Sequence, residues 1–211
     1  MIATNLLLSK IHSCRKCSLH KNQPPLLDDR SSADVIWVGL SAVRVADVYA
    51  DIPLSTSSRS GSLLSHVEAF DLGIRYYRTN LVKCLPLQKG RIRYPTGAEM
   101  SSCYENLRLE IEALKPATVF LLGKMVTECI TSSEQHPPHR LDPDFKYGHL
   151  MISGAAYVPV HHPSFVLMYR RTRIAEYVER LRAAIRESVV PGRSRKDLQK
   201  VGYETKLAAC S

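Results

Sequence analysis

Four short apolar runs constrain the fold of this chain more than any other sequence feature. The runs are Val35–Leu40, Tyr77–Val82, Thr118–Leu122 and Tyr157–Val160. Their apolar character is largely continuous rather than alternating, which is typical of strands that are covered on both faces in a parallel sheet. Ligands of such sheets bind beyond the carboxyl ends of the strands, so the segments that follow each run are the first places to expect a site.

Helical patterns lie between and around these runs. One helix is expected from about Glu99 to Lys115, with Thr96 and Glu99 as a capping box and Pro116 after its end. Two others are expected from about Thr172 to Glu187 and from about Gly61 to Gly73. Strands that alternate with helices predict an α/β fold, a three-layer α/β/α domain around a central four-stranded parallel sheet.

The length of 211 residues suits one domain, which we expect to span residues 1–190, followed by a basic, polar tail over 191–211. No stretch approaches the roughly 20 apolar residues that span a bilayer. The apolar run at the N-terminus is too short for a secretory signal, so we expect a cytoplasmic protein.

The charge is strongly basic, with 29 Lys and Arg against 20 Asp and Glu and a net charge of +9. A basic balance favours a polyanionic partner, most simply a nucleic acid. Composition alone leaves a second interpretation open, in which the positive charge is only a solvated surface.

Six cysteines occur, and two of them form the pair Cys14-x2-Cys17. A tight pair places two thiolates on one loop, although it is equally compatible with a redox motif or with free thiols. Cys84 after the second run and Cys103 in the expected helix complete a set of four, which favours a metal site. Spacing alone does not separate zinc from an iron–sulfur cluster. We expect Cys129 to be a buried structural thiol and assign no role to Cys210.

Several segments together resemble a known family. The segments are CRKC, ADVIWVGLSA, SGSLL, YYRTNLVKCLP, PTGAEMSSC, LKPATVFLLGK and VPVHHPS. In order and spacing they resemble the uracil-DNA glycosylase superfamily, specifically its iron–sulfur branches, families 4 and 5, from about Ile11 to about Arg182. The resemblance implies a four-iron, four-sulfur cluster on Cys14, Cys17, Cys84 and Cys103, a four-stranded parallel sheet, and DNA as the partner. We expect a monomer without an obligate protein partner.

The resemblance also implies a division of chemical roles. Asn80, whose amide both donates and accepts hydrogen bonds, matches the residue that reads a flipped base. His162, directly before Pro163, matches the histidine that hydrogen-bonds the pyrimidine O2 as charge develops there. Asp47 is our candidate for positioning water and stabilising the sugar cation, with Asp51 as the other acid of the same loop.

The segment after the first run departs from the family pattern. Family 4 has an acidic residue where this chain has Leu40, and family 5, with its Gly-Leu-Ala-Pro-Ala run, is closer to Gly39-Leu40-Ser41-Ala42-Val43. The aromatic stacking residue of the family is replaced by Leu54. We expect Gly39, Leu40, Ser41 and Leu54 to line the substrate pocket, with His161 in its wall.

DNA contacts are expected from the segment after the last run. Ser164 and backbone amides after Gly39 and Ser60 suit phosphates. Phe165, Leu167 and Met168 suit the gap that a flipped base leaves in the duplex, with core packing as the alternative. The basic residues that suit the duplex backbone are Arg170, Arg171 and Arg173, with Arg15 and Lys16 of the cysteine loop.

The departures from the family predict a wide pocket and therefore a modified pyrimidine. The superfamily includes anti-phage glycosylases that remove glucosylated 5-hydroxymethylcytosine, which makes antiviral defence one expectation and repair of uracil or a deaminated base the other. No lysine is obviously placed as a Schiff-base nucleophile, so simple hydrolysis to an abasic site is expected. Two rival classes remain: a non-catalytic iron–sulfur DNA-binding protein, which Leu40 favours, and a zinc-bound nucleic-acid module.

Overall fold

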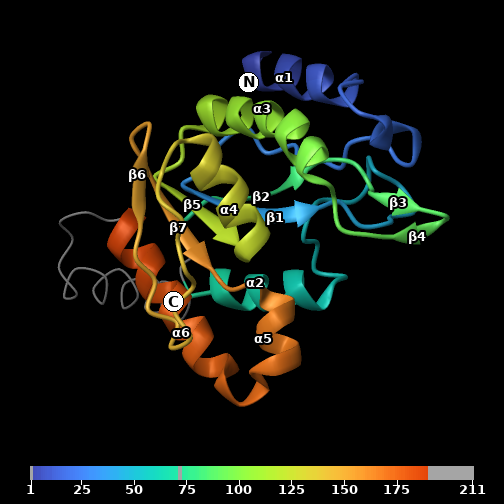
Figure 1. Ribbon diagram of the computed structural model, residues 1–211. Coiled ribbons are helices and arrows are strands. Elements are labelled where there is room, and N and C mark those ends of the chain that lie inside the picture. The colour runs from blue at the N-terminus through green and yellow to red at the C-terminus, as the bar shows by residue number, and fades with distance from the viewer. Residues whose placement is uncertain (1, 71–72, 190–211) are drawn as a thin grey trace, which may run out of the picture.

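A five-stranded sheet forms the centre of the computed structural model, which describes residues 2–70 and 73–189. The strand order is β2-β1-β5-β7-β6 (Figure 1). Four strands are parallel, namely β1 (Val35–Ser41), β2 (Tyr76–Val82), β5 (Thr118–Leu122) and β7 (Ala155–Val160). The predicted α/β fold with its parallel sheet is therefore confirmed, and the expected tail 191–211 lies outside the described residues.

The fifth strand corrects the expected four-stranded sheet. β6 (Leu150–Ile152) pairs antiparallel with β7 at the edge of the sheet. Three residues carry no periodic signal, so the sequence did not predict this strand. A tight turn joins the two strands, with positive φ at Ser153 (49°) and Gly154 (85°).

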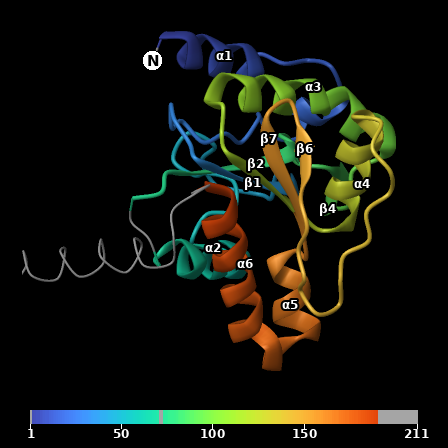
Figure 2. The ribbon, with the colours of Figure 1, turned by 90° about the vertical axis from the view of Figure 1, so that its left-hand side faces the viewer.

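Helices cover both faces of the sheet, as Figures 1 and 2 show. One face packs on α3 (Gly97–Leu114) and α4 (Lys124–Ser133), with α1 (Ile2–His12) lying against α3. The other face packs on α2 (Arg59–Glu68), α5 (Pro163–Tyr169) and α6 (Ile174–Val189). Side chains of β1 alternate between the two layers, because Ile36 belongs to the first apolar cluster and Trp37 to the second.

Local signals explain most helix ends. The capping box of Thr96 and Glu99 is present at the start of α3, and Lys115 closes the helix in a left-handed conformation before Pro116. The second helix, α2, is shorter than expected and ends at Glu68, well before Gly73. The side chain of Ser58 caps its first turn by accepting a hydrogen bond from Gly61 N.

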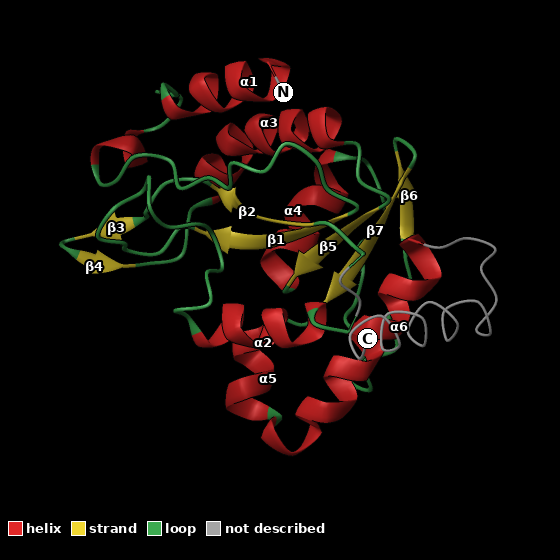
Figure 3. Cartoon of the chain, turned by 180° about the vertical axis from the view of Figure 1, so that it is seen from behind, coloured by secondary structure: helices red, strands yellow, loops and turns green. Residues whose placement is uncertain are grey.

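Several other elements were not predicted from the sequence. They are α1, α5, 3-10 turns over Ser18–Lys21 and Arg171–Arg173, and a two-stranded hairpin of β3 (Leu87–Gln88) and β4 (Arg91–Ile92). Figure 3 shows the hairpin extending from the body of the domain. Among the helices of the described parts, none has the length and apolarity that a bilayer crossing requires.

A buried ion pair fixes the segment at the end of β2. Lys83 and Glu110 of α3 are each 1% exposed and form a salt bridge. The ammonium group also donates to the Thr79 hydroxyl at 2.6 Å, and the Tyr77 hydroxyl donates to the Glu110 carboxylate at 3.0 Å. Because an unpaired buried charge is costly, this network holds β2 and α3 in one register.

Candidate functional site

The main cavity lies at the carboxyl ends of the parallel strands, where ligands of such sheets bind. Its volume is about 1010 Å³. The structure brings most of the residues expected at the site to its lining, which includes Leu40, Ser41, Asp51, Leu54, Asn80, His161, His162, Ser164, Phe165 and Met168. The lining runs along the chain from Leu26 to Tyr169, and these distant segments meet because parallel strands end at one edge of the sheet.

Asn80 sits in the floor of this cavity and is 3% exposed. It lies opposite Gly39 in the parallel pairing of β1 with β2. A Cβ atom at position 39 would approach the Asn80 Oδ1 atom to 2.4 Å. Gly39 is therefore required for the Asn80 side chain to occupy its place, which explains the glycine although it does not itself line the cavity.

His162 caps the first turn of α5 from the cavity wall. Its Nδ1 atom accepts a hydrogen bond from the Ser164 backbone N–H at 3.1 Å and lies 2.8 Å from the Ser164 hydroxyl. Burial lowers the pKa of His162 to about 4, so the ring is neutral at physiological pH. Since Nδ1 accepts a hydrogen bond, the single ring proton resides on Nε2, which becomes a donor.

His161 stands beside it in a cluster of aromatic rings. Its Nδ1 atom lies 3.2 Å from the Tyr147 hydroxyl, and its ring stacks on Phe165 with centroids 5.4 Å apart. Burial is also the main cause that lowers the pKa of His161. These contacts fix the ring in place, which agrees with the expected position in the pocket wall.

The structure separates the two acids of the loop after β1. Asp47 is exposed and does not line the cavity, and its carboxylate accepts a hydrogen bond from Tyr49 N at 2.8 Å in a local turn. Asp51 lines the cavity and is half-buried. Of the two acids that the sequence offered, with Asp47 as the candidate, the structure therefore places Asp51 and not Asp47 at the cavity.

Helix α5 presents only some of the expected DNA-contacting side chains. Phe165 and Met168 line the cavity and are 38% and 61% exposed, as a wedge requires. Leu167 instead packs against the second apolar cluster, which is the core-packing alternative considered for these side chains.

The three arginines that follow α5 do not line the cavity. Arg173 forms ion pairs with Glu176 and Asp144 and lies over the Phe145 ring, so it has partners within the chain. Arg171 donates to the Leu167 carbonyl at 2.9 Å, and Arg170 is exposed. Arg170 and Arg171 thus remain candidates for contacts outside the cavity.

Several residues that line the cavity were not identified from the sequence. They are Arg44, Arg59, Tyr94, Lys124 and Tyr169. Arg44 and Lys124 follow the first and third parallel strands closely, so their positions after strand ends could have identified them. Tyr94 lies in the segment after β2, and the course of the β3–β4 hairpin brings it to the cavity.

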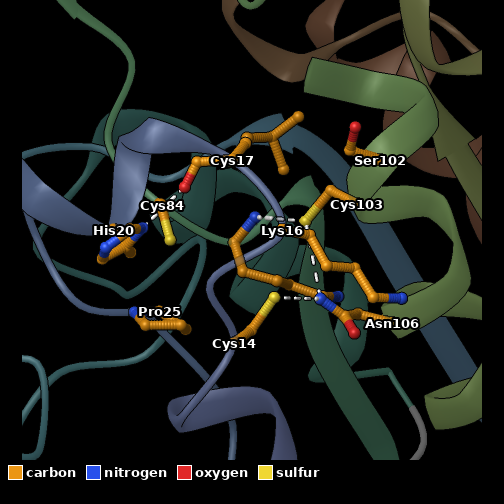
Figure 4. A pocket seen from close by; sticks show the side chains of 11 residues that line it. Cys14, Lys16, Cys17, His20, Pro25, Cys84, Ser102, Cys103 and Asn106 are labelled. Carbon is orange, nitrogen blue, oxygen red and sulfur yellow. Dashed lines mark hydrogen bonds between the residues drawn. The ribbon is translucent and has the colours of Figure 1, made fainter. Parts of the chain in front are cut away.

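A second, smaller pocket lies between the N-terminal loop and α3. Cys14, Cys17, Cys84 and Cys103 all line it, and Figure 4 shows them gathered around one space. The Cys103 sulfur accepts a hydrogen bond from Lys83 N at 3.4 Å, and the Asn106 amide donates to the Cys14 sulfur at 3.4 Å. The structure thus brings together the four cysteines that the sequence singled out, whereas Cys129 lies apart and is half-buried.

The chemistry of this pocket suits a bound cation. Burial, followed by the nearby Cys103, Cys17 and Cys14, raises the pKa of the Cys84 thiol to about 12. Four thiolates this close together need a positive centre to offset their repulsion. Among the described residues, no group of three or more His, Cys, Asp or Glu side chains has the spacing to hold a single metal ion.

Residues 28–186 match the family model of the uracil DNA glycosylase superfamily. The chain belongs to the uracil DNA glycosylase superfamily. The match covers the four parallel strands and all the cavity residues named above. It does not include Cys14 and Cys17, which precede residue 28.

This member of the uracil DNA glycosylase superfamily is similar to the type-4 uracil-DNA glycosylase of Archaeoglobus fulgidus. The two are 30% identical over 129 residues, which is 59% of this chain and 61% of the relative. The chain therefore matches less than two thirds of the relative's length. The family predicted from the sequence motifs is therefore confirmed. The three-layer fold described above is consistent with this family.

Proposed function

We propose that this protein is a monofunctional DNA glycosylase that acts as a monomer on a flipped base and leaves an abasic site. The observation that carries the proposal is the meeting of Asn80 and a neutral His162 in one cavity at the carboxyl edge of the sheet. The side-chain amide can both donate to and accept from the edge of a base. A neutral imidazole with its proton on Nε2 can donate a hydrogen bond to an oxygen of the base.

The proposed reaction assigns one task to each side chain. Asn80 hydrogen-bonds the extruded base and orients it. His162 donates from Nε2 to the pyrimidine O2 as the N-glycosidic bond breaks and electrons pass to the departing base. Ser164 holds the imidazole through its backbone N–H at 3.1 Å, so the donor is oriented before the substrate enters.

Asp51, rather than Asp47, is the acid to which we assign the role of stabilising the sugar cation. It is the acid of the loop after β1 that lines the cavity. A carboxylate there stabilises positive charge on the sugar and orients the water that captures C1′. Hydrolysis then completes the reaction, and the glycosidic bond is replaced by a C1′–OH bond.

DNA is the partner that the charges of the cavity favour. Its lining includes the cations Arg44, Arg59 and Lys124 against the single acid Asp51. The net charge of the whole chain is +9. Phosphates are attracted to such a surface, and the bound strand is held beside the base-reading residues.

The base that we favour is a modified pyrimidine, with glucosylated 5-hydroxymethylcytosine of phage DNA as the candidate. The cavity volume of about 1010 Å³ is at the upper end for ligand sites. Leu40 and Leu54 line it where the family carries an acid and an aromatic ring. Uracil is the second candidate substrate, because the similar archaeal protein is a uracil-DNA glycosylase.

A four-iron, four-sulfur cluster is the cofactor that we propose for Cys14, Cys17, Cys84 and Cys103. Four thiols from the N-terminal loop, the segment after β2 and α3 share one pocket. Four cysteine thiolates are the usual ligand set of such a cluster. Its task is structural: it ties the N-terminal loop to α3 and to the segment after β2.

A panel of duplexes tests the function. Each duplex carries one uracil, hypoxanthine or glucosylated 5-hydroxymethylcytosine, and base release is scored by alkaline cleavage of the abasic product. We expect release of the glucosylated base, and its loss in Asn80→Ala and His162→Ala. His149→Ala, an exposed histidine outside the cavity, is the matched control and should keep the parent rate.

The outcomes of the panel are distinct. Release of uracil alone would refute the wide-pocket substrate and retain the glycosylase. No release from any duplex, with DNA binding intact, would identify a non-catalytic DNA-binding protein. Trapping with borohydride tests the hydrolytic mechanism, because Lys124 lines the cavity and a covalent adduct there would indicate a lyase.

The cofactor is tested by anaerobic purification. We expect a brown protein that absorbs at about 400 nm. It should carry about four iron atoms per chain, the content of a four-iron cluster on four thiolates. Cys84→Ser should lose the absorption, and Cys129→Ser should keep it. A colourless protein with stoichiometric zinc would refute the cluster.

A further inference from the structure

The β3–β4 hairpin is a built element that the proposed chemistry does not use. A two-residue loop joins its strands, and both loop residues have positive φ, Lys89 at 49° and Gly90 at 76°. Such a loop is the tight primed turn that matches the twist of a hairpin. Figures 1 and 3 show the hairpin projecting beyond the carboxyl end of β1.

The hairpin is anchored on two sides. Arg93 forms an ion pair with Glu99 at 2.6 Å and so ties its base to the first turn of α3. At its tip, Arg44 of the loop after β1 donates to the Gly90 carbonyl at 3.4 Å. These contacts make the hairpin a fixed extension of the domain.

The exposed side of the hairpin is positive. Lys89 and Arg91 are both exposed, and among the described residues no carboxylate pairs with either of them. The hollow on this side is lined by Gln88, Lys89, Arg91, Ile92 and Arg93, a set without an acid. Fixed cations that lack an acidic partner suit a polyanion.

Exposed apolar side chains continue from the hairpin into the main cavity. Ile92 is 56% exposed and Tyr94 is 75% exposed. Tyr94 lines the same cavity as Asn80 and His162, and Phe165 and Met168 of α5 line it as well. The cavity therefore has aromatic side chains from two separate elements, of which only α5 was expected to touch DNA.

We propose that the β3–β4 hairpin with Tyr94 forms a second DNA-contacting wall of the cavity. Lys89, Arg91 and Arg44 contact phosphates of the strand, and Tyr94 stacks on an unpaired base next to the flipped nucleotide. Positive charge recognises the backbone and an exposed ring recognises a base face, which together are the properties of a nucleic-acid surface. The inference rests on the proposed function in taking DNA as the partner and a flipped nucleotide as its bound form.

The first test measures binding to an undamaged duplex by fluorescence anisotropy over a series of salt concentrations. The slope of log Kd against log salt should fall by about 2 in Lys89→Ala/Arg91→Ala, because each lost phosphate contact removes about 0.9. Lys146→Ala/Arg180→Ala is the matched control: it removes two exposed cations that line a different hollow, beside α6. This control should keep the parent slope.

The second test isolates the ring of Tyr94. The probe is a duplex with a single abasic analogue, which leaves one base unpaired. Tyr94→Ala should weaken binding by about 5-fold to 150-fold, the range for one lost base stack, and Tyr94→Phe should restore it. Since Tyr94 is 75% exposed, neither substitution removes core packing.

A parent slope in Lys89→Ala/Arg91→Ala, or parent affinity in Tyr94→Ala, would overturn this proposal. Affinity that falls equally in the control double variant would overturn it too, because the effect would then be one of net charge. These binding measurements do not depend on base release. A protein that binds duplexes through the hairpin but releases no base refutes the glycosylase proposal and retains the second wall.

Discussion

Gly39→Ala offers a sharp test of the role given to Asn80. The added methyl group would lie 2.4 Å from the Asn80 Oδ1 atom, and real Cβ contacts are essentially never closer than 3.0 Å. The amide must therefore move by at least about 0.6 Å. Its neighbours leave little room, because Asn80 is 3% exposed and Leu54 lies 3.5 Å from the same methyl position.

The expected cost is larger for catalysis than for folding. A displacement of about 1 Å in a positioning group lowers a rate by about 100-fold, so single-turnover base release should fall by about that factor. Overpacking by one methyl group destabilises a core by about 1–3 kcal/mol, which a urea unfolding curve measures. Gly97→Ala is the control, since nothing lies within 4 Å of a Cβ at that position.

A double-mutant cycle assigns the loss to Asn80 itself. In the Asn80→Ala background the methyl group meets no amide, so Gly39→Ala should lower the rate of base release no further. Parent activity in Gly39→Ala would refute the reasoning, because it would show that the amide position does not matter. An undiminished effect of Gly39→Ala in the Asn80→Ala background would equally contradict it.

Three further predictions follow from the described contacts. The pKa of His162, about 4 against an ordinary 6.5, means that the unfolded chain binds the proton first as the pH falls. Up to about 3 kcal/mol of stability should therefore be lost between pH 6.5 and pH 4, and unfolding of His162→Gln should show a flatter pH profile. Lys83→Met leaves the Glu110 carboxylate buried without its cation and should lower the free energy of unfolding by about 3–5 kcal/mol in urea titrations, whereas Lys83→Met/Glu110→Leu should recover part of it. Asp51→Asn should slow single-turnover base release by about 100-fold, and Asp47→Asn should not; the reverse result would restore the first assignment.

Sequence reasoning worked best where a signal is local. The four parallel strands were placed within one or two residues of their ends, because short apolar runs between helices leave few alternatives. The capping box of Thr96 and Glu99 located the start of α3 to within two residues. The same reasoning missed β6 and the β3–β4 hairpin, whose strands of two or three residues are too short for any period to appear.

Candidate site residues at strand ends were also accessible to the sequence. Asn80 lies near the carboxyl end of β2 and His162 follows β7, and the ends of parallel strands meet at one edge. The sequence thus determined the edge at which a site would form. It did not determine which loop side chains reach that edge, because Asp47 and Asp51 are four residues apart with the same chemistry.

Tertiary contacts decided those remaining questions. The Asp47 carboxylate accepts a local hydrogen bond from Tyr49 N, and Leu167 packs on the core. Arg173 forms ion pairs with Glu176 and Asp144. The same level of structure folds the hairpin so that Tyr94 reaches the cavity. Periodicity and capping specify strands and helices through neighbouring residues. The path of a loop depends instead on distant partners. Only the folded chain therefore shows which loop side chains face the cavity.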